Sequence, residues 1–199
     1  MSEWTEACAS MAAALTSPIP EAYFEARGRL GRVAATARPG VADAELRSFV
    51  EASEPELRVL AALDPGLEAE HLERLAGDAA LVVRVAVAGN PSVPPPALAA
   101  FYRDGSWHIR AELAENAATP GWMLPFLAED RNASVRAALA RRKPLPDAIV
   151  SKLAADGDWR VRAAAATNRA LPTARLRELA SDNDSRVAGL ARKTLSGQR

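Results

Sequence analysis

An apolar residue followed by arginine recurs along the chain at a fixed interval of 26 residues. The clear copies are Leu57-Arg58, Val83-Arg84, Ile109-Arg110, Val135-Arg136 and Val161-Arg162. A sixth copy keeps Val187 but has Ala188 in place of arginine, and Arg32 marks a degraded copy upstream. An interval that persists without insertions indicates a structural unit repeated in tandem, and this restricts the fold to a stacked array of short elements.

Other positions recur in the same register. Proline recurs at Pro94, Pro120, Pro146 and Pro172, and asparagine at Asn90, Asn116 and Asn168, with Arg142 in the remaining copy. Two apolar columns lie three residues apart: Leu46, Leu72, Leu98, Leu124, Val150 and Leu176, then Phe49, Leu75, Phe101, Leu127, Leu153 and Leu179. Aspartate closes each unit, at Asp78, Asp104, Asp130, Asp156 and Asp182. These columns define one unit that is repeated along the chain.

Each unit is predicted to form two short helices. The first runs from the arginine motif for about two turns, and the asparagine is expected to cap its C-terminus in the left-handed conformation. Proline starts the second helix, whose two apolar columns lie on one face, and aspartate caps or turns the chain into the next unit. Because such short helices are marginal alone, they must stack on their neighbours. The pattern therefore predicts an all-α solenoid of 26-residue two-helix repeats.

The pattern D-x-x-W-x-V-R-x-A-x-A-x-N-x-x-x-P-x-x-x-L-x-x-L-A resembles the leucine-rich repeat variant family. The resemblance is carried by WRVRAAAATNRALPTARLRELASD and covers roughly residues 54–195, and the apolar-Arg-x-Ala core is more weakly similar to HEAT-like repeats. It implies two-helix units, often with one 3₁₀ helix, stacked into a right-handed superhelix. Some members carry an N-terminal cysteine cluster for an iron–sulfur centre. This chain has only Cys8, so that cluster is not expected and no cofactor is predicted.

The chain is predicted to have three parts. Residues 1–30 do not fit the register, and WTEACASMAAAL and EAYFEARGRL, separated by SPIP, predict an N-terminal helical cap over the apolar face of the first repeat. Residues 31–195 form the solenoid of about six repeats, clearest over 54–187, and residues 196–199 form a frayed tail.

Composition argues against several classes of function. A single cysteine allows neither an intrachain disulfide nor a multi-cysteine zinc site. No apolar run approaches the roughly 20 residues of a membrane span, and the N-terminus lacks the basic start of a signal peptide. We expect a soluble cytoplasmic protein. No phosphate loop, G-x-S-x-G or H-E-x-x-H motif occurs, and His71 and His108, in different columns, are expected at a surface or edge. The sequence predicts a protein that is not an enzyme.

Two columns could be either sites or parts of the fold. The arginine column, Arg58, Arg84, Arg110, Arg136 and Arg162, could form a ladder that binds phosphates or acidic helices. We favour pairing of each arginine with a neighbouring aspartate or helix C-terminus, because the column persists in both acidic and basic surroundings. Trp107 and Trp159 share a column with Leu81, Ala133 and Ser185. This mixture predicts a partly buried edge between repeats rather than anchors for a partner.

The strongest candidate for a binding site is a predicted basic cluster near the C-terminal end. Residues 131–199 hold 15 basic and 6 acidic residues, whereas residues 1–79 hold 7 basic and 14 acidic residues. The predicted basic cluster consists of Arg141, Arg142, Lys143, Arg169 and Lys193. Arg142 replaces the expected asparagine, so the pattern that builds the fold does not require the cluster. The alternative is a solvated charged loop, which is the commoner outcome for such residues.

The predicted function is a non-enzymatic interaction scaffold that presents an extended surface to a protein partner with an acidic segment. The alternative is binding of DNA or another nucleic acid through the basic C-terminal repeats, against which the acidic N-terminal half argues. A small-molecule-binding or enzymatic role with a non-local site is the third possibility. It would require a concave pocket with converging polar groups.

Overall fold

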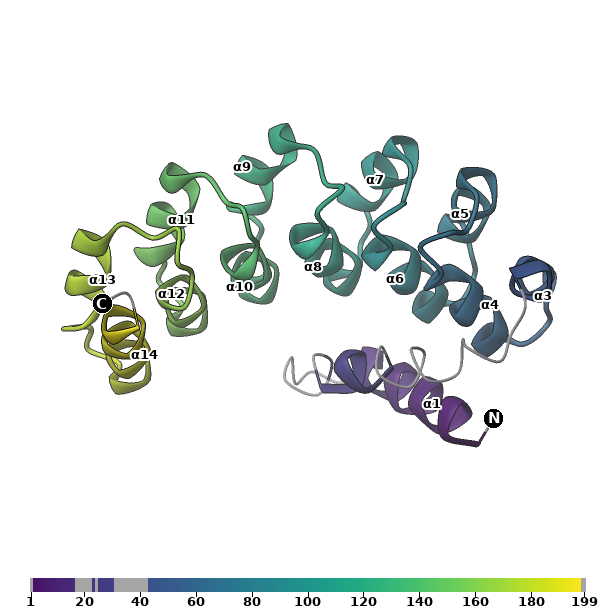
Figure 1. The fold of residues 1–199 in the computed structure, drawn as a ribbon, viewed down its shortest axis with the longest axis horizontal. Helices are drawn as coiled ribbons and strands as arrows, with labels where there is room; N and C mark the ends of the chain where they lie inside the picture. The colour runs from purple at the N-terminus through teal and green to yellow at the C-terminus, as the bar shows by residue number, and fades with distance from the viewer. Residues whose placement is uncertain (1, 17–22, 24, 31–42, 198–199) are drawn as a thin grey trace. The chain divides into compact units, whose positions relative to one another are not determined.

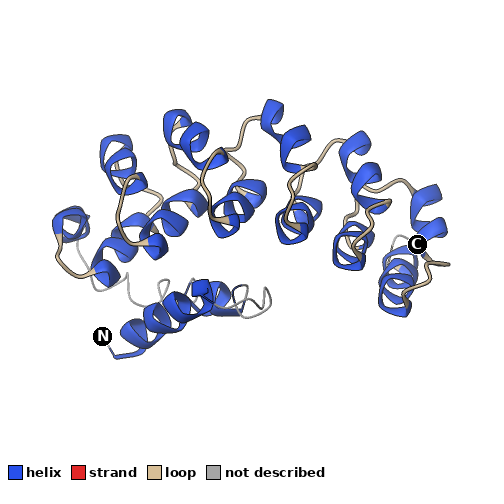
Figure 2. Ribbon diagram, turned by 180° about the vertical axis from the view of Figure 1, so that it is seen from behind, coloured by secondary structure: helices blue, strands red, loops and turns tan. Residues whose placement is uncertain are grey.

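In a computed structural model of the chain, the described residues form helices joined by short loops, with no strand among them (Figures 1 and 2). The structure describes residues 2–16, 23, 25–30 and 43–197. The all-α class is confirmed, and the packing of consecutive helices is consistent with a helical solenoid. The chain divides into two compact units, Met1–Ile109 and Arg110–Arg199, which we call the N-terminal unit and the C-terminal unit.

Helices of two kinds alternate along the chain. The first helices begin 26 residues apart: α4 (Pro55–Ala62), α6 (Leu81–Gly89), α8 (Trp107–Glu115), α10 (Ala133–Arg141), α12 (Trp159–Ala166) and α14 (Ser185–Ser196). The second helices follow at the same interval: α5 (Ala69–Ala76), α7 (Pro95–Tyr102), η3 (Gly121–Met123) with α9 (Leu124–Leu127), α11 (Asp147–Ala154) and α13 (Thr173–Leu179). Ahead of them lie α3 (Asp43–Ser48) and the 3₁₀ helix η2 (Phe49–Glu51).

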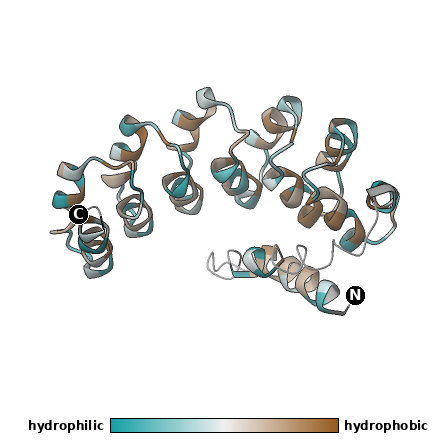
Figure 3. Ribbon diagram, viewed as in Figure 1, coloured by the Kyte–Doolittle hydropathy of each residue, from teal (hydrophilic) through white to brown (hydrophobic). Residues whose placement is uncertain are grey.

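The core of each unit is built from the apolar columns. Val83 in the N-terminal unit and Val135, Val161 and Val187 in the C-terminal unit are completely buried on their first helices. The second helices bury their leucine and valine columns, because positions three residues apart share one face. Figure 3 shows the same pattern, with α6 brown over most of its length. Burial of these columns against the first helices is the main source of stability for helices this short.

The asparagine column does not adopt the left-handed cap that the sequence suggested. Asn90 is extended, with φ −70° and ψ 128°, and no described residue has a positive φ. Its carboxamide nitrogen donates to the carbonyl oxygens of Ala62 and Asp64, at 2.7 and 2.8 Å. Asn90 does occupy the C-cap position of α6, but the expected left-handed conformation is wrong: its side chain satisfies free carbonyls of the preceding repeat.

The prolines and aspartates of the repeat lie where many of its helices begin. Proline occupies the N-cap position before α7, η3, α11 and α13, one residue earlier than a proline in the first turn would lie. The carboxylate of Asp156 accepts a hydrogen bond from the backbone N–H of Asp158 at 2.8 Å, and Asp158 in turn caps α12. Before α10, α12 and α14 the closing aspartate thus turns the chain and the residue two positions later caps the helix, whereas Ala80, before α6, has no capping side chain.

The N-terminal helix α1 (Ser2–Thr16) packs against α4 and α6. The indole nitrogen of Trp4 donates to the carbonyl of Glu56 at 3.2 Å, and Met11 is buried beneath the helix. Further along, buried Tyr23 contacts Trp107 and His108 at the start of α8. Within the N-terminal unit this segment therefore contacts a series of first helices.

Several sequence predictions fall outside the described residues: the SPIP break within 17–22, the degraded copy at Arg32, and the end of the predicted tail at 198–199. The division into a cap of residues 1–30 and a solenoid of residues 31–195 therefore stays a prediction. Over the described ranges, no helix combines the length and the apolar character needed to cross a membrane.

Candidate functional site

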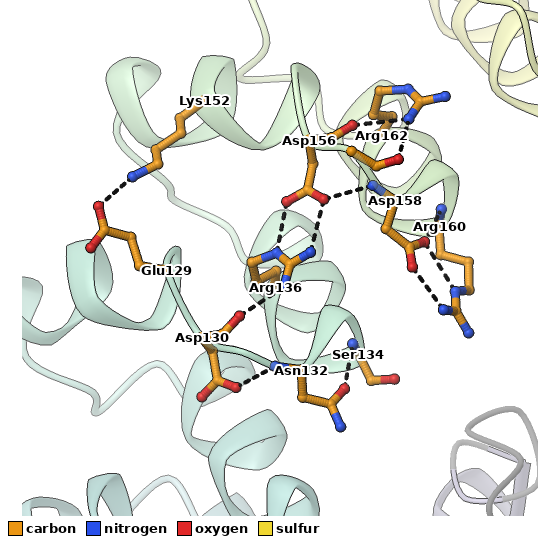
Figure 4. Close-up of polar contacts among 11 residues, drawn as sticks. Glu129, Asp130, Asn132, Ser134, Arg136, Lys152, Asp156, Asp158, Arg160 and Arg162 are labelled. Atoms are coloured by element: carbon orange, nitrogen blue, oxygen red, sulfur yellow. Dashed lines mark hydrogen bonds and ion pairs between the residues drawn. The ribbon is translucent and has the colours of Figure 1, made fainter.

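In the C-terminal unit, members of the arginine and aspartate columns form a continuous series of hydrogen bonds, which we call the relay (Figure 4). In the C-terminal unit, Arg136 donates two hydrogen bonds to the Asp156 carboxylate, at 2.7 and 2.9 Å, and one to the Asp130 carbonyl at 2.7 Å. Arg162 repeats the arrangement with the Asp182 carboxylate, at 2.8 and 3.0 Å, and the Asp156 carbonyl at 2.9 Å. Each guanidinium therefore bridges the aspartates at the two ends of its own repeat.

The other members of the column are also paired with aspartate. Arg110 contacts Asp130 and Arg58 contacts Asp78, each with a shortest distance of 2.6 Å, and Arg84 lies 3.8 Å from Asp104. Their donors are used inside the fold, and none of these arginine side chains is more than 23% exposed. This leaves little capacity for a phosphate or an acidic helix from outside.

The pairing also shifts the pKa values of the paired residues. A hydrogen bond from Arg162 lowers the pKa of Asp182, with burial opposing it. Burial would raise the pKa of Asp156, but hydrogen bonds from Arg136 and from the Asp158 N–H outweigh it, so that pKa is lowered. Correspondingly, the hydrogen bond to Asp156 raises the pKa of Arg136. Both members of the Arg136–Asp156 and Arg162–Asp182 pairs are therefore charged at neutral pH.

The two tryptophans of the shared column are both half-buried but have different neighbours. The guanidinium carbon of Arg186 lies 3.3 Å from the centre of the Trp159 ring, and Asp184 holds Arg186 in place with a contact of 2.6 Å. Trp107 instead stacks on His108, at a centroid distance of 3.9 Å. Each ring is covered by its own chain, so neither is a free aromatic anchor.

His108 is buried, whereas the sequence predicted that it would lie at a surface or edge. It is only 5% exposed, its Nδ1 lies 3.2 Å from the Ser106 hydroxyl, and its Nε2 has no partner among the described residues. Burial lowers the pKa of His108 to about 4. The position one repeat earlier, Val82, is also buried, and these two positions lie where the N-terminal segment packs.

The sequence prediction is also wrong for Arg142, which was interpreted as a surface cation that the fold does not need. It is 9% exposed, and its guanidinium donates to the carbonyls of Asn116, Ala117 and Thr119. The side chain thus does in its repeat what Asn90 does in another: it satisfies carbonyls of the preceding repeat. No hydrogen bond or ion pair joins it to a carboxylate of the described residues, and burial lowers the pKa of Arg142.

The remaining members of the predicted basic cluster divide into two groups. Arg141 is paired with Glu115, with a nitrogen–oxygen distance of 2.8 Å. Lys143, Arg169 and Lys193 are exposed, and their side chains make no hydrogen bond or ion pair with any described residue. We call these three residues the basic edge.

The fold places the members of the basic edge in neighbouring repeats. The Asn168 carboxamide donates to the Arg142 carbonyl at 3.0 Å, so the loops that carry the next residues, Lys143 and Arg169, are bonded to each other. These two cations hold the same register position, 26 residues apart. Lys193 lies on α14, which packs against α12. The three cations therefore follow the stacking direction of the C-terminal unit.

Cations without an acidic partner among the described residues account for the net positive charge of the C-terminal unit. The unit holds 16 basic and 10 acidic residues, a surplus of six. Most of its carboxylates pair with its own cations: Glu115, Glu129, Asp130, Asp156, Asp158, Glu178, Asp182 and Asp184. The surplus positive charge therefore includes Arg142 and the basic edge, with Arg131 and Arg177 elsewhere on the unit.

An exposed aromatic pair was not found from the sequence. Trp122 is 59% exposed and Phe126 is 52% exposed, and their rings lie 6.5 Å apart at roughly a right angle. The same positions in the next repeat are Ala148 and Lys152, so periodicity gives no indication of them. Exposed aromatic rings are favourable points of contact for another protein.

A pocket in the N-terminal unit offers no catalytic chemistry. It has a volume of about 310 Å³ and is lined mainly by apolar residues of α1, α4 and α6, together with Cys8 and Glu56. Burial, with a smaller contribution from Glu56, raises the pKa of the Cys8 thiol to about 12. The thiol therefore stays protonated at neutral pH and is a poor nucleophile. Within the described parts of the chain, no three histidine, cysteine or carboxylate residues are grouped so as to hold a metal ion.

Comparison with known families bears on one repeat of this array. Residues 159–184 match the leucine rich repeat variant family model. The predicted resemblance is confirmed for this segment. The leucine rich repeat variant unit spans α12 and α13 and contains the Arg162–Asp182 pair and Asn168. Leucine rich repeat variant proteins are helical-repeat proteins that commonly serve as interaction scaffolds. No curated protein matches the chain.

Proposed function

We propose that the chain is a non-enzymatic protein-interaction module that binds an acidic segment of a partner at the basic edge. The observation that carries the proposal is the exposure of Lys143, Arg169 and Lys193 without acidic partners. Elsewhere in the same unit, most carboxylates are paired with the unit's own cations. Cations that remain exposed and unpaired are available to carboxylates of another chain.

The surroundings of the basic edge strengthen its attraction for an acidic segment. Arg142 places a buried positive charge next to Lys143, and no carboxylate of the described residues pairs with it. Charges of one sign on adjacent loops add to a common potential, which attracts acidic groups and speeds their association.

The backbone beneath the basic edge is held by side-chain hydrogen bonds. Asn168 bonds to the carbonyls of Ala140 and Arg142, and Arg142 bonds to those of the loop before it. A surface that is already ordered loses little conformational freedom when a partner binds. The same rigidity restricts the loops to positions set by the stacking of the repeats.

Binding of a fluorescein-labelled oligoglutamate peptide to the full chain tests the proposal, with fluorescence anisotropy as the readout. We expect Lys143→Glu/Arg169→Glu to weaken binding at low salt by at least about tenfold, because two attractive contacts become repulsive. Arg131→Glu/Arg177→Glu is the matched control, because it makes the same charge change at exposed, unpaired cations away from the edge. No binding of the peptide, or equal loss in both variants, would overturn the proposal.

Nucleic-acid binding is the competing function, and the distribution of charge argues against it. Proteins whose DNA affinity depends steeply on salt make about 6–10 phosphate contacts, and the basic edge supplies three free cations. The N-terminal unit holds 15 acidic and 9 basic residues, which would repel a duplex. A gel shift with duplex DNA at low salt that disappears in Lys143→Glu/Arg169→Glu and is not competed by oligoglutamate would favour nucleic acid instead.

A cytoplasmic location belongs to the same proposal. It is supported by the chain's cysteine usage, since Cys8 is the one cysteine and is a buried free thiol.

A further inference from the structure

The spacing of the cations in the basic edge indicates which backbone conformation of an acidic segment would fit them. We infer that the segment binds in the polyproline II conformation, with an acidic residue at every third position. The inference rests on the proposed function and adds to it the conformation and the sequence pattern of the partner.

The first step is the spacing of the cations along the stack. Lys143 and Arg169 hold equivalent positions in successive repeats, and the Asn168–Arg142 hydrogen bond of 3.0 Å joins their loops. The helices that precede them, α10 and α12, pack directly against each other. Because packed helices lie about 8–10 Å apart, the equivalent loops present one cation at about that interval.

The second step is to find a backbone conformation that presents carboxylates at the same interval on one side. Polyproline II has three residues per turn and rises about 3.1 Å per residue, so every third side chain points the same way, about 9 Å apart. A β-strand alternates faces, and its same-face positions recur at about 6.7 and 13 Å. A strand therefore fits the interval poorly, whereas polyproline II fits it closely. A helix with carboxylates seven residues apart, about 10 Å, also fits, but a short helix must first be ordered at a cost.

The third step concerns the cost of binding. Polyproline II is a major conformation of unfolded chains, and charged segments extend through self-repulsion, so an acidic segment already populates the bound shape. Lys193 continues the row in the next repeat, two residues before the equivalent register position. Its long, flexible stem lets the ammonium extend the row of positive charge without holding the same register position. The basic edge thus suits three acidic residues in the pattern Glu-x-x-Glu-x-x-Glu.

A comparison of peptides with equal composition tests the inference on the full chain. The periodic peptide consists of repeated Glu-Pro-Ser triplets, and its matched control has the same residues with the glutamates in adjacent pairs. We expect the periodic peptide to bind at least about fivefold more tightly at low salt, because all its carboxylates face the cation row. In Lys143→Glu/Arg169→Glu this preference should disappear.

A gain of binding provides a second test that does not depend on damaging the fold. Ala117 is exposed and holds the position of Lys143 and Arg169 in the preceding repeat of the same unit. Its backbone carbonyl accepts a hydrogen bond from Arg142, and a change of its side chain leaves that bond available. Ala117→Lys lengthens the row, so we expect a larger gain in binding for the periodic peptide than for the paired one, which gains only from the added positive charge.

The outcomes separate the two proposals. If both peptides bind equally and both are weakened by Lys143→Glu/Arg169→Glu, the acidic partner stands and the polyproline II conformation is overturned. Tighter binding of a helical peptide with glutamate at every seventh position also overturns the conformation, because that spacing on a helix spans about 10 Å. If neither peptide binds, the proposed function itself fails, and this inference fails with it.

Discussion

Asn168 donates a hydrogen bond from its carboxamide to the backbone carbonyl of Arg142, 3.0 Å away. The two residues occupy the same position in successive repeats. Arg142 in turn donates to carbonyls of the loop before it, at residues 116, 117 and 119. In the C-terminal unit, one column therefore ties successive loops together with two different side chains. A buried cation can replace an amide here because every acceptor is a carbonyl oxygen.

The first prediction concerns Arg142. Arg142→Ala should lower the free energy of unfolding by about 2–3 kcal/mol, because buried carbonyls lose their donors and the removed side chain leaves a cavity. Arg142→Asn should recover part of that loss, since it restores the residue found at Asn90 and Asn168. Urea denaturation of the two variants measures the difference. Unchanged stability of Arg142→Ala would show that these hydrogen bonds contribute little.

The second prediction concerns the relay of arginines and aspartates. A double-mutant cycle on Arg136 and Asp156 should give a coupling free energy of about 1–2 kcal/mol, because the pair is bidentate and mostly buried. The exposed pair Arg175–Glu178 is the control and should give less than about 0.5 kcal/mol. Equal coupling in the two cycles would argue that burial does not strengthen the relay.

The third prediction is a loss of stability in mild acid that depends on His108. Its pKa is about 4 in the folded protein and 6.5 in its ordinary state, so the unfolded chain takes up the proton first as pH falls. Stability should therefore fall between about pH 6.5 and 4, by up to about 3 kcal/mol. The relay contributes to acid sensitivity only at lower pH, because the pKa values of Asp156 and Asp182 are lowered from 3.8.

Urea midpoints at several pH values between 7 and 4 measure this effect. His108→Phe should flatten the profile in that window, because the replacement cannot take up a proton. His71→Gln, which changes the other histidine of the chain, serves as the control and should keep the wild-type profile. A profile that stays steep in His108→Phe would assign the acid sensitivity to other groups.

The fourth prediction uses Cys8 as a reporter of the packing of α1. The thiol is buried, and its raised pKa of about 12 disfavours the reactive thiolate. We expect slow reaction with a thiol reagent in the native protein at pH 8, and rapid reaction once urea unfolds it. Fast stoichiometric labelling under native conditions would mean that α1 detaches readily from α4 and α6.

The sequence predicted the fold from its columns, because periodic apolar positions determine which faces must be buried. Both partners of the relay were visible as columns, so the favoured pairing of Arg136 with an aspartate could be stated in advance. The roles of Asn90 and Arg142 could not, since their acceptors are backbone carbonyls of the preceding repeat, which leave no trace in the sequence. The available signal was Arg142, a longer polar residue in a column that otherwise holds asparagine, and it was interpreted as a surface feature.

The burial of His108 was hidden for a different reason. Its column contains Val82, His108, Ser134, Arg160 and Arg186, a mixture with no clear apolar character. The column is covered where the N-terminal segment packs on it, and that segment lies outside the repeat register. Periodicity describes contacts between repeats, so it carries no information about a helix that packs across them.

The relay makes the repeat a module that can be exchanged as a whole. Asp156 gives its carboxylate to Arg136 and its carbonyl to Arg162, so it serves both as the last acceptor of one repeat and as the first acceptor of the next. If residues 156–181 were duplicated, every arginine of the column would still pair with an aspartate at the same position of the repeat. It would also add one more cation equivalent to Arg169. The number of modules therefore sets the length of the row of exposed cations, and evolution or design can change that length without altering the hydrogen bonds between modules.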